Sequence, residues 1–168
     1  YVWNKLFRRE VLDGIRFSTE LSFAEDYEMF CRVLEQCGRI VCGTKTKYYY
    51  MQRKSGVCNC GYDRTYQKAM MMFEDYCRIY SRRYPQYKKL FENHYLFDLM
   101  GMAAAMSRNG NYVAADCRKI KKYVRQKLPQ YLMDKKVSLH LKGSACMISV
   151  SVRAFGAVYR LLHGVESE

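Results

Sequence analysis

The sequence predicts an α/β fragment over residues 1–61, followed by a mainly helical extension over residues 62–168. Two short apolar or aromatic runs, residues 39–42 and 45–52, favour strands, and both follow a stretch with helical spacing. After residue 61 the apolar residues recur with the 3.6-residue period of helices. Only two prolines occur among 168 residues, which favours long helices over a loop-rich fold.

The predicted helix of the first part begins near Ala24 and ends at Gly38. Glu25, Asp26 and Glu28 fall in its first turn, where the positive end of the helix dipole favours carboxylates. Gly38 is suited to cap the C-terminal end. This helix is expected to lie between an irregular N-terminal segment and the two short strands.

The extension is expected to form four helices packed as an irregular bundle. They are predicted over residues 63–84, 85–107, 111–128 and 137–163, with proline suited to the first turn of the second and to the end of the third. The apolar stripe of the last helix is too short for a coiled coil and is typical of a core-facing helix. Arg153 interrupts its apolar run, so we expect no membrane span there.

The charge balance favours anionic partners. The formal net charge is +13 and the pI is about 9.4. Between Tyr112 and Lys142, two acids, Asp116 and Asp134, stand against nine basic residues. Nucleic acid, anionic lipid or phosphate-bearing substrates would suit such a surface, although a merely solvated basic surface is the simpler interpretation.

The cysteines and histidines do not form a metal-binding pattern. Eight cysteines are scattered through the chain, and only Cys58 and Cys60 are close together, which is a poor zinc pattern without a second pair. We expect reduced thiols packed as small apolar groups. His94, His140 and His163 match no metal-ligand spacing, so no metal site is expected in this chain.

Four segments carry a resemblance to a known family. They are Trp3–Arg9 (Trp-Asn-Lys-Leu-Phe-Arg-Arg), Ile15–Phe17 (Ile-Arg-Phe), the Glu25–Asp26 pair at a helix start, and Tyr48–Ser55 (Tyr-Tyr-Tyr-Met-Gln-Arg-Lys-Ser). In this order and at this spacing they resemble the C-terminal part of the catalytic domain of family 2 glycosyltransferases, which are inverting enzymes with a GT-A fold. The resemblance covers about the first third of the chain.

The resemblance implies transfer of a sugar from a nucleotide-sugar donor to a saccharide or lipid-linked acceptor, in cell-surface polysaccharide synthesis. Such a reaction needs a base that removes the proton of the attacking hydroxyl. The resemblance assigns this role to Asp26, with Glu25 orienting the base or contacting the acceptor. From the pattern alone, both acids are more simply explained as stabilising the helix start.

Gln52, Arg53 and Ser55 are the candidates for binding the donor diphosphate. Arginine offers a fork of donors that matches phosphate, and serine adds a neutral donor. Met51 stands where the family more often has arginine, so the first half of this loop departs from the pattern. An ordinary solvated basic turn is the alternative.

Trp3 and Lys5 would lie on the acceptor side of the pocket if the resemblance holds. A lone tryptophan is more often a core residue than a platform for a sugar. The three tyrosines at 48–50 are expected to pack, with alternate rings facing the core.

The nucleotide-binding half that comes first in the family has no counterpart in this sequence. We therefore expect a front-truncated piece that is inactive alone, and a complete enzyme that uses Mg²⁺ or Mn²⁺ held by ligands outside this chain. The expected location is the cytoplasm, or the inner membrane face if the basic helices bind lipid.

Two other functions remain open: a basic helical nucleic-acid-binding module, which lacks any recognition motif, and a structural interaction domain. One continuous basic face across several helices would favour nucleic acid. Charge spread around the helices, with Arg53 turned toward Glu25 and Asp26, would favour the transferase.

Overall fold

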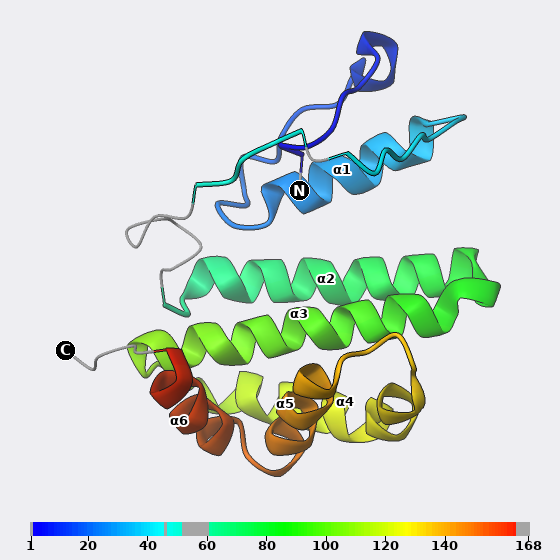
Figure 1. Cartoon of the computed structure of the whole chain (residues 1–168). Coiled ribbons are helices and arrows are strands. Elements are labelled where there is room, and N and C mark those ends of the chain that lie inside the picture. Colours follow the sequence, from blue (N-terminus) through cyan, green and yellow to red (C-terminus); the bar gives the residue numbers. More distant parts are fainter. Residues whose placement is uncertain (1, 46, 52–60, 164–168) are drawn as a thin grey trace. The chain divides into compact units, whose positions relative to one another are not determined.

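A computed structural model of the chain describes residues 2–45, 47–51 and 61–163 (Figure 1). Among these residues it contains α-helices and short 3-10 helices joined by turns and irregular segments. In chain order they are η1 (Arg9–Leu12), α1 (Glu25–Gln36), α2 (Arg64–Arg83), η3 (Pro85–Tyr87), α3 (Lys88–Asn109), α4 (Ala114–Met133), α5 (Leu139–Val150) and α6 (Val152–His163).

The prediction of an α/β, GT-A-like fragment is wrong, because the described residues contain helices and no strand. The two segments expected as strands, 39–42 and 45–52, have no regular structure where they are described. A strand exists only through backbone bonds to a second strand, and no backbone bond of this kind involves either segment among the described residues. Their apolar side chains therefore stay exposed, Val41 at 80% and Met51 at 79%.

The chain divides into two compact units, residues 1–58 and 59–168. The first unit has a small core in which Ile15 packs with Met29 and Val33 of α1. Side chains from the N-terminal segment, η1 and the end of α1 surround this core: Val2, Phe7, Val11, Leu12 and Cys37. The predicted helix near residue 24 is thus the scaffold of this unit.

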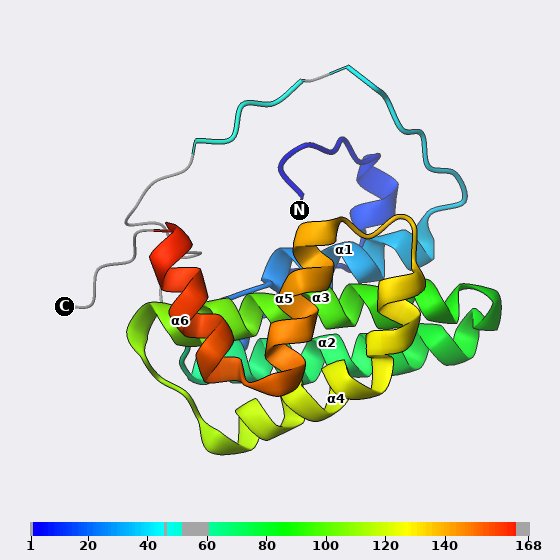
Figure 2. The ribbon, with the colours of Figure 1, turned by 60° about the horizontal axis from the view of Figure 1, so that its bottom comes forward.

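Helix α3 is the centre of the second unit. It is apolar on most sides, as expected of a helix surrounded by others, and Leu96, Leu99 and Met106 are fully buried. Helix α2 runs antiparallel along α3, and α4, α5 and α6 cover much of the rest of its surface (Figures 1 and 2).

Two residues at the start of the second unit bond to its helices: Asp63 caps α2, and Tyr62 bonds to the backbone of α3. Asp63 caps α2, accepting bonds from the backbone N–H groups of Thr65 at 2.9 Å and Tyr66 at 3.1 Å. Tyr62 is fully buried, and its backbone N–H donates to the carbonyl of Ala105 in α3 at 3.2 Å.

The described part of the extension, residues 62–163, contains five α-helices instead of the expected four, because the last one is divided at Ser151. This residue is extended (φ −157°, ψ 124°), and its hydroxyl accepts a bond from the backbone N–H of Ala154 at 3.2 Å, which caps α6. The break changes the chain direction, so that Ile148 of α5 and Phe155 of α6 both reach the core.

The predicted end of the third helix at Pro129 is also wrong. Helix α4 continues to Met133, although proline removes one backbone bond and costs about 3 kcal/mol in a helix interior. Tyr131, only 2% exposed, anchors this last turn in the core and offsets part of that cost. No helix in the described part of the chain is both long and apolar enough to cross a membrane.

Candidate active site at the start of helix α1

The candidate acids lie where the sequence predicts them, in the first turn of α1. Glu25 and Asp26 are its first two residues, and both are half-buried. The residue before them, Ala24, has φ 62° and ψ 19° and is the one non-glycine residue with positive φ in the described chain. This conformation costs an alanine roughly 1–2 kcal/mol. Strain of this kind often occurs at functional sites.

The third acid of this turn, Glu28, has a structural partner. Arg32 donates to Glu28 Oε2 at 2.8 Å. The same guanidinium also contacts the backbone carbonyl of Arg16 at 2.5 Å. This bridge attaches the Ile15–Phe17 motif to α1 at Arg32, about two turns after the candidate acids.

The first motif lies on the face of α1 that carries Asp26. The ammonium of Lys5 is 4.8 Å from the ring centroid of Phe30, and the ring of Phe7 meets Phe30 edge-on at 6.3 Å. Phe30 follows Asp26 by four residues, so the two side chains are neighbours on one face of the helix. The candidate base and Lys5, an expected acceptor-side residue, therefore share one side of α1.

Trp3 contacts the fourth motif. Its ring stacks on Tyr48 at 4.9 Å and on Tyr50 at 5.1 Å between centroids, whereas Tyr49 is 91% exposed. The alternate tyrosines thus turn to the same partner, but the prediction that they face a core is wrong, because Tyr48 and Tyr50 remain 44% and 50% exposed. A sugar stacking on Trp3 would have to share the indole with these two rings.

The residues predicted to bind the donor diphosphate, Gln52, Arg53 and Ser55, lie outside the described residues. Within the described part of the chain, no three His, Cys, Asp or Glu side chains gather as a metal site requires. The cysteines of the described segments are free thiols.

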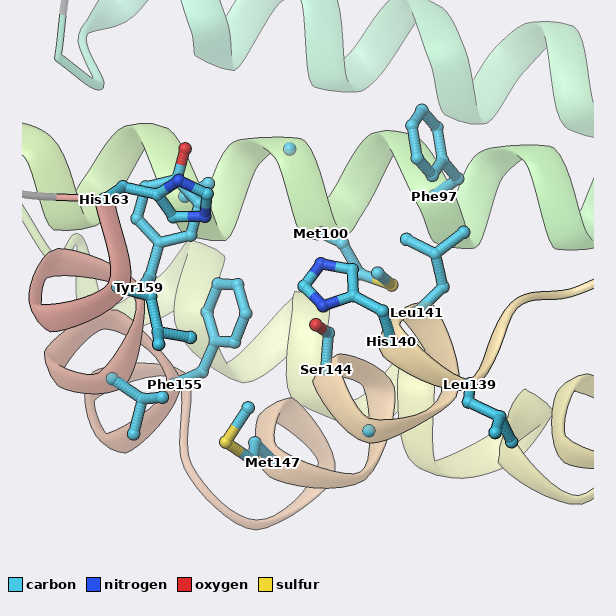
Figure 3. Close-up of a pocket in the computed structure, with 15 residues that line it drawn as sticks. Phe97, Met100, Leu139, His140, Leu141, Ser144, Met147, Phe155, Tyr159 and His163 are labelled. Carbon is cyan, nitrogen blue, oxygen red and sulfur yellow. The ribbon is translucent and has the colours of Figure 1, made fainter.

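The second unit holds an apolar pocket that the sequence analysis missed. It lies between α3, α5 and α6 and has a volume of about 370 Å³ (Figure 3). Met100, Phe155 and Tyr159 line it, with His140 and Ser144 on successive turns of α5. An apolar lining with a few polar groups is typical of small-molecule pockets. The heptad spacing of residues 141–162 indicates some of the apolar residues of the pocket. It does not indicate the division into two helices that forms the pocket.

Comparison of the chain with protein-family models, with curated proteins and with solved structures found no match. The glycosyltransferase resemblance therefore depends on the four motifs alone.

Proposed function

We propose that this chain is the base-bearing, acceptor-side part of a glycosyltransferase, which transfers a sugar from a nucleotide-sugar to a saccharide or lipid-linked acceptor in cell-surface polysaccharide synthesis. The observation that carries the proposal is the packing of the first three motifs on α1, together with the stacking of Tyr48 and Tyr50, in the described part of the fourth motif, on Trp3. Lys5 of the first motif lies over Phe30, Arg32 bonds to Arg16 of the second, and the third begins the helix. Trp3 then joins the first motif to the fourth.

In this proposal Asp26 removes the proton of the acceptor hydroxyl as that oxygen attacks the anomeric carbon. A carboxylate held at a fixed position in the first turn of a helix can act as the base. Glu25 orients the base or contacts the acceptor, and Lys5 binds on the acceptor side. The strained backbone at Ala24 supports this assignment, because it sets the direction in which the first turn presents its acids.

Gln52, Arg53 and Ser55 bind the donor diphosphate, with positive charge that stabilises the leaving group. Mg²⁺ or Mn²⁺ would neutralise the same diphosphate in the complete enzyme. The described residues offer no ligand set that fits such an ion, so no step proposed for this chain passes through it.

The helical unit holds the enzyme at an anionic membrane surface. Leu161 and Leu162 at the end of α6 are 84% and 69% exposed, and Arg153 is exposed on the same helix. Exposed apolar and basic side chains together suit a membrane interface, where each basic residue contributes about 1 kcal/mol. Cosedimentation with anionic but not zwitterionic vesicles, reduced by Leu161→Ser with Leu162→Ser, tests this part.

Transfer assays on the full reading frame that encodes this chain test the central claim. Asp26→Asn keeps the shape of the side chain and removes its basicity, so turnover should fall roughly a hundredfold or more while donor binding persists. Asp13→Asn, an exposed acid in the turn after η1, is the matched control and should leave turnover unchanged. Equal turnover in Asp26→Asn and wild type would refute the assignment.

The main alternative is a basic helical module that binds nucleic acid. Exposed basic residues on α2, α3, α4 and α6 are the feature that supports this alternative. If the wild-type protein shows no sugar transfer and binds nucleic acid tightly in a salt-sensitive manner, the alternative is favoured.

A further inference from the structure

A second hollow lies between α2, α3 and α4, on the side of α3 opposite to the apolar pocket. Lys88, Glu92 and Tyr95 recur every three or four residues on one face of α3, whereas Phe97 and Gly101 of the apolar pocket fall half a turn away. Its volume is about 370 Å³. Basic and hydroxyl-bearing side chains are prominent in its lining: Arg78, Ser81, Arg82, Lys88, Tyr95, Tyr123 and Lys127.

Tyr95 lines this hollow, and its buried hydroxyl has no partner among the described residues. Tyr95 is only 3% exposed, its ring packs edge-on against Tyr123 at 4.7 Å, and its hydroxyl makes no hydrogen bond to any described residue. By contrast, the Tyr123 hydroxyl donates to the carbonyl of Glu92 at 3.5 Å. Because buried polar groups are nearly always hydrogen-bonded, an unpaired hydroxyl in a hollow indicates a missing ligand.

The acids of the hollow are already neutralised. Glu92 accepts bonds from Lys127 at 2.8 Å and from Gln130 at 3.0 Å, and Glu74 pairs with Lys119. Burial alone raises the pKa of Glu92, but the bonds from Lys127 and Gln130 outweigh it and hold this pKa below its usual range. Glu92 therefore remains charged, and both acids are bonded to lysines, so neither forms an ion pair at contact distance with the other basic groups of the lining.

Two of these basic groups stand out. Arg82 and Lys88 line the hollow, and neither makes an ion pair at contact distance within the described residues. Arg78, a third basic residue of the lining, is held by Asp75 at 2.6 Å. The hollow thus combines surplus positive charge with a buried hydroxyl donor.

We propose that this hollow binds an oxyanion of the phosphate class, with the Tyr95 hydroxyl donating a hydrogen bond and Arg82 and Lys88 neutralising its charge. Arginine and lysine are the side chains that phosphate groups recruit. The volume exceeds that of a single phosphate, so the ligand carries the phosphate on a larger group, either a soluble phosphate compound or a lipid headgroup. This site is separate from the proposed transferase residues and does not depend on them.

Binding of inorganic pyrophosphate to the full chain, followed by ³¹P NMR and calorimetry, tests the proposal. Tyr95→Phe removes only the hydroxyl and should weaken binding at least roughly tenfold. Arg82→Gln and Lys88→Gln, both exposed and safe for folding, should each weaken it several-fold. The matched control is Tyr112→Phe, because this hydroxyl is also buried without a partner but lies outside the hollow.

A parallel measurement with vesicles containing phosphatidic acid, against phosphatidylcholine alone, separates the two sources. Pyrophosphate binding that depends on Tyr95 supports a soluble ligand. Binding confined to phosphatidic acid vesicles, with the same dependence on Tyr95, supports a headgroup. Absence of binding in both assays, or equal binding by wild type and Tyr95→Phe, would overturn the proposal. Asp26→Asn should change neither result, so this test fails or succeeds independently of the transferase assay.

Discussion

The hydroxyl of Tyr62 is a buried donor whose contribution to stability can be measured directly. Tyr62 is fully buried, and its hydroxyl donates to Asp116 Oδ2 at 3.0 Å. The same oxygen accepts a bond from Gln67 Nε2 at 2.8 Å. Tyr62→Phe therefore removes one bond between the start of the unit and α4, and leaves the Asp116 carboxylate with its second donor.

The expected loss follows from the charge on the acceptor. A hydrogen bond to a charged group contributes about 1.5–3 kcal/mol. Because Gln67 still satisfies Asp116, the loss should fall in the lower half of this range, about 2 kcal/mol. For a unit of this size, such a loss lowers Tm by roughly 10 °C.

Tyr95→Phe is the matched control, since the same atom is removed from another buried tyrosine, whose hydroxyl has no partner among the described residues. Without phosphate, its unfolding free energy should stay within about 0.5 kcal/mol of wild type. Urea denaturation followed by far-UV circular dichroism gives both values. Equal losses in Tyr62→Phe and Tyr95→Phe would refute the reasoning, because the bond to Asp116 would then contribute nothing measurable.

The pH dependence provides a second check on the same two residues. Burial raises the pKa of Tyr62 above its usual value, and the nearby carboxylate of Asp116 raises it further. Burial likewise raises the pKa of Tyr95. When folding raises the pKa of a group, the free energy of unfolding is unaffected at pH values below the pKa of the unfolded state. It falls as the pH rises above that pKa, because the unfolded state then loses the proton more readily than the folded state. The wild type should therefore lose stability above roughly pH 10, and each phenylalanine variant should lose less.

Two further predictions concern backbone positions. Gly156→Ala places a methyl group against the Tyr112 hydroxyl and 3.0 Å from Ser107 Cβ, so it should destabilise by about 1–2 kcal/mol; Gly143→Ala, with open space around it, should instead stabilise by up to about 1 kcal/mol in the same urea assay. Ala24→Gly relieves the positive φ and should leave stability unchanged or raise it by up to about 1 kcal/mol. If Ala24→Gly instead lowers the free energy of unfolding by about 1 kcal/mol, as glycine does in a helix interior, the backbone at this position is not strained.

The local elements of the fold were largely predictable, because their signals lie in adjacent residues. The acids after Ala24 predict the start of α1, and the period after Asp63 predicts α2. The break at Ser151 had a signal that was overlooked, namely a serine able to cap the next helix. The continuation of α4 past Pro129 has no signal in the neighbouring residues, because it depends on the burial of Tyr131 in the core.

The strands were wrongly predicted because propensity does not supply a partner. Tyr48 and Tyr50 alternate as strand residues do, yet the ring of Trp3 holds them and no backbone ladder does. The hollow around Tyr95 could not be predicted either, since its lining comes from three helices. Only the packed structure reveals that this hydroxyl has no partner whereas that of Tyr62 has one.

The acids of the helical unit explain why an anionic partner is expected whichever proposal holds. Every acid between residues 61 and 163 is engaged by a group within the unit, whether a basic side chain, an amide, a hydroxyl or a helix N-terminus. They are Asp63, Glu74, Asp75, Glu92, Asp98, Asp116 and Asp134. The far more numerous lysines and arginines consequently have few acids left to pair with. Binding of phosphate, lipid or nucleic acid to this unit should therefore weaken as salt concentration rises, because salt ions screen the exposed basic charges.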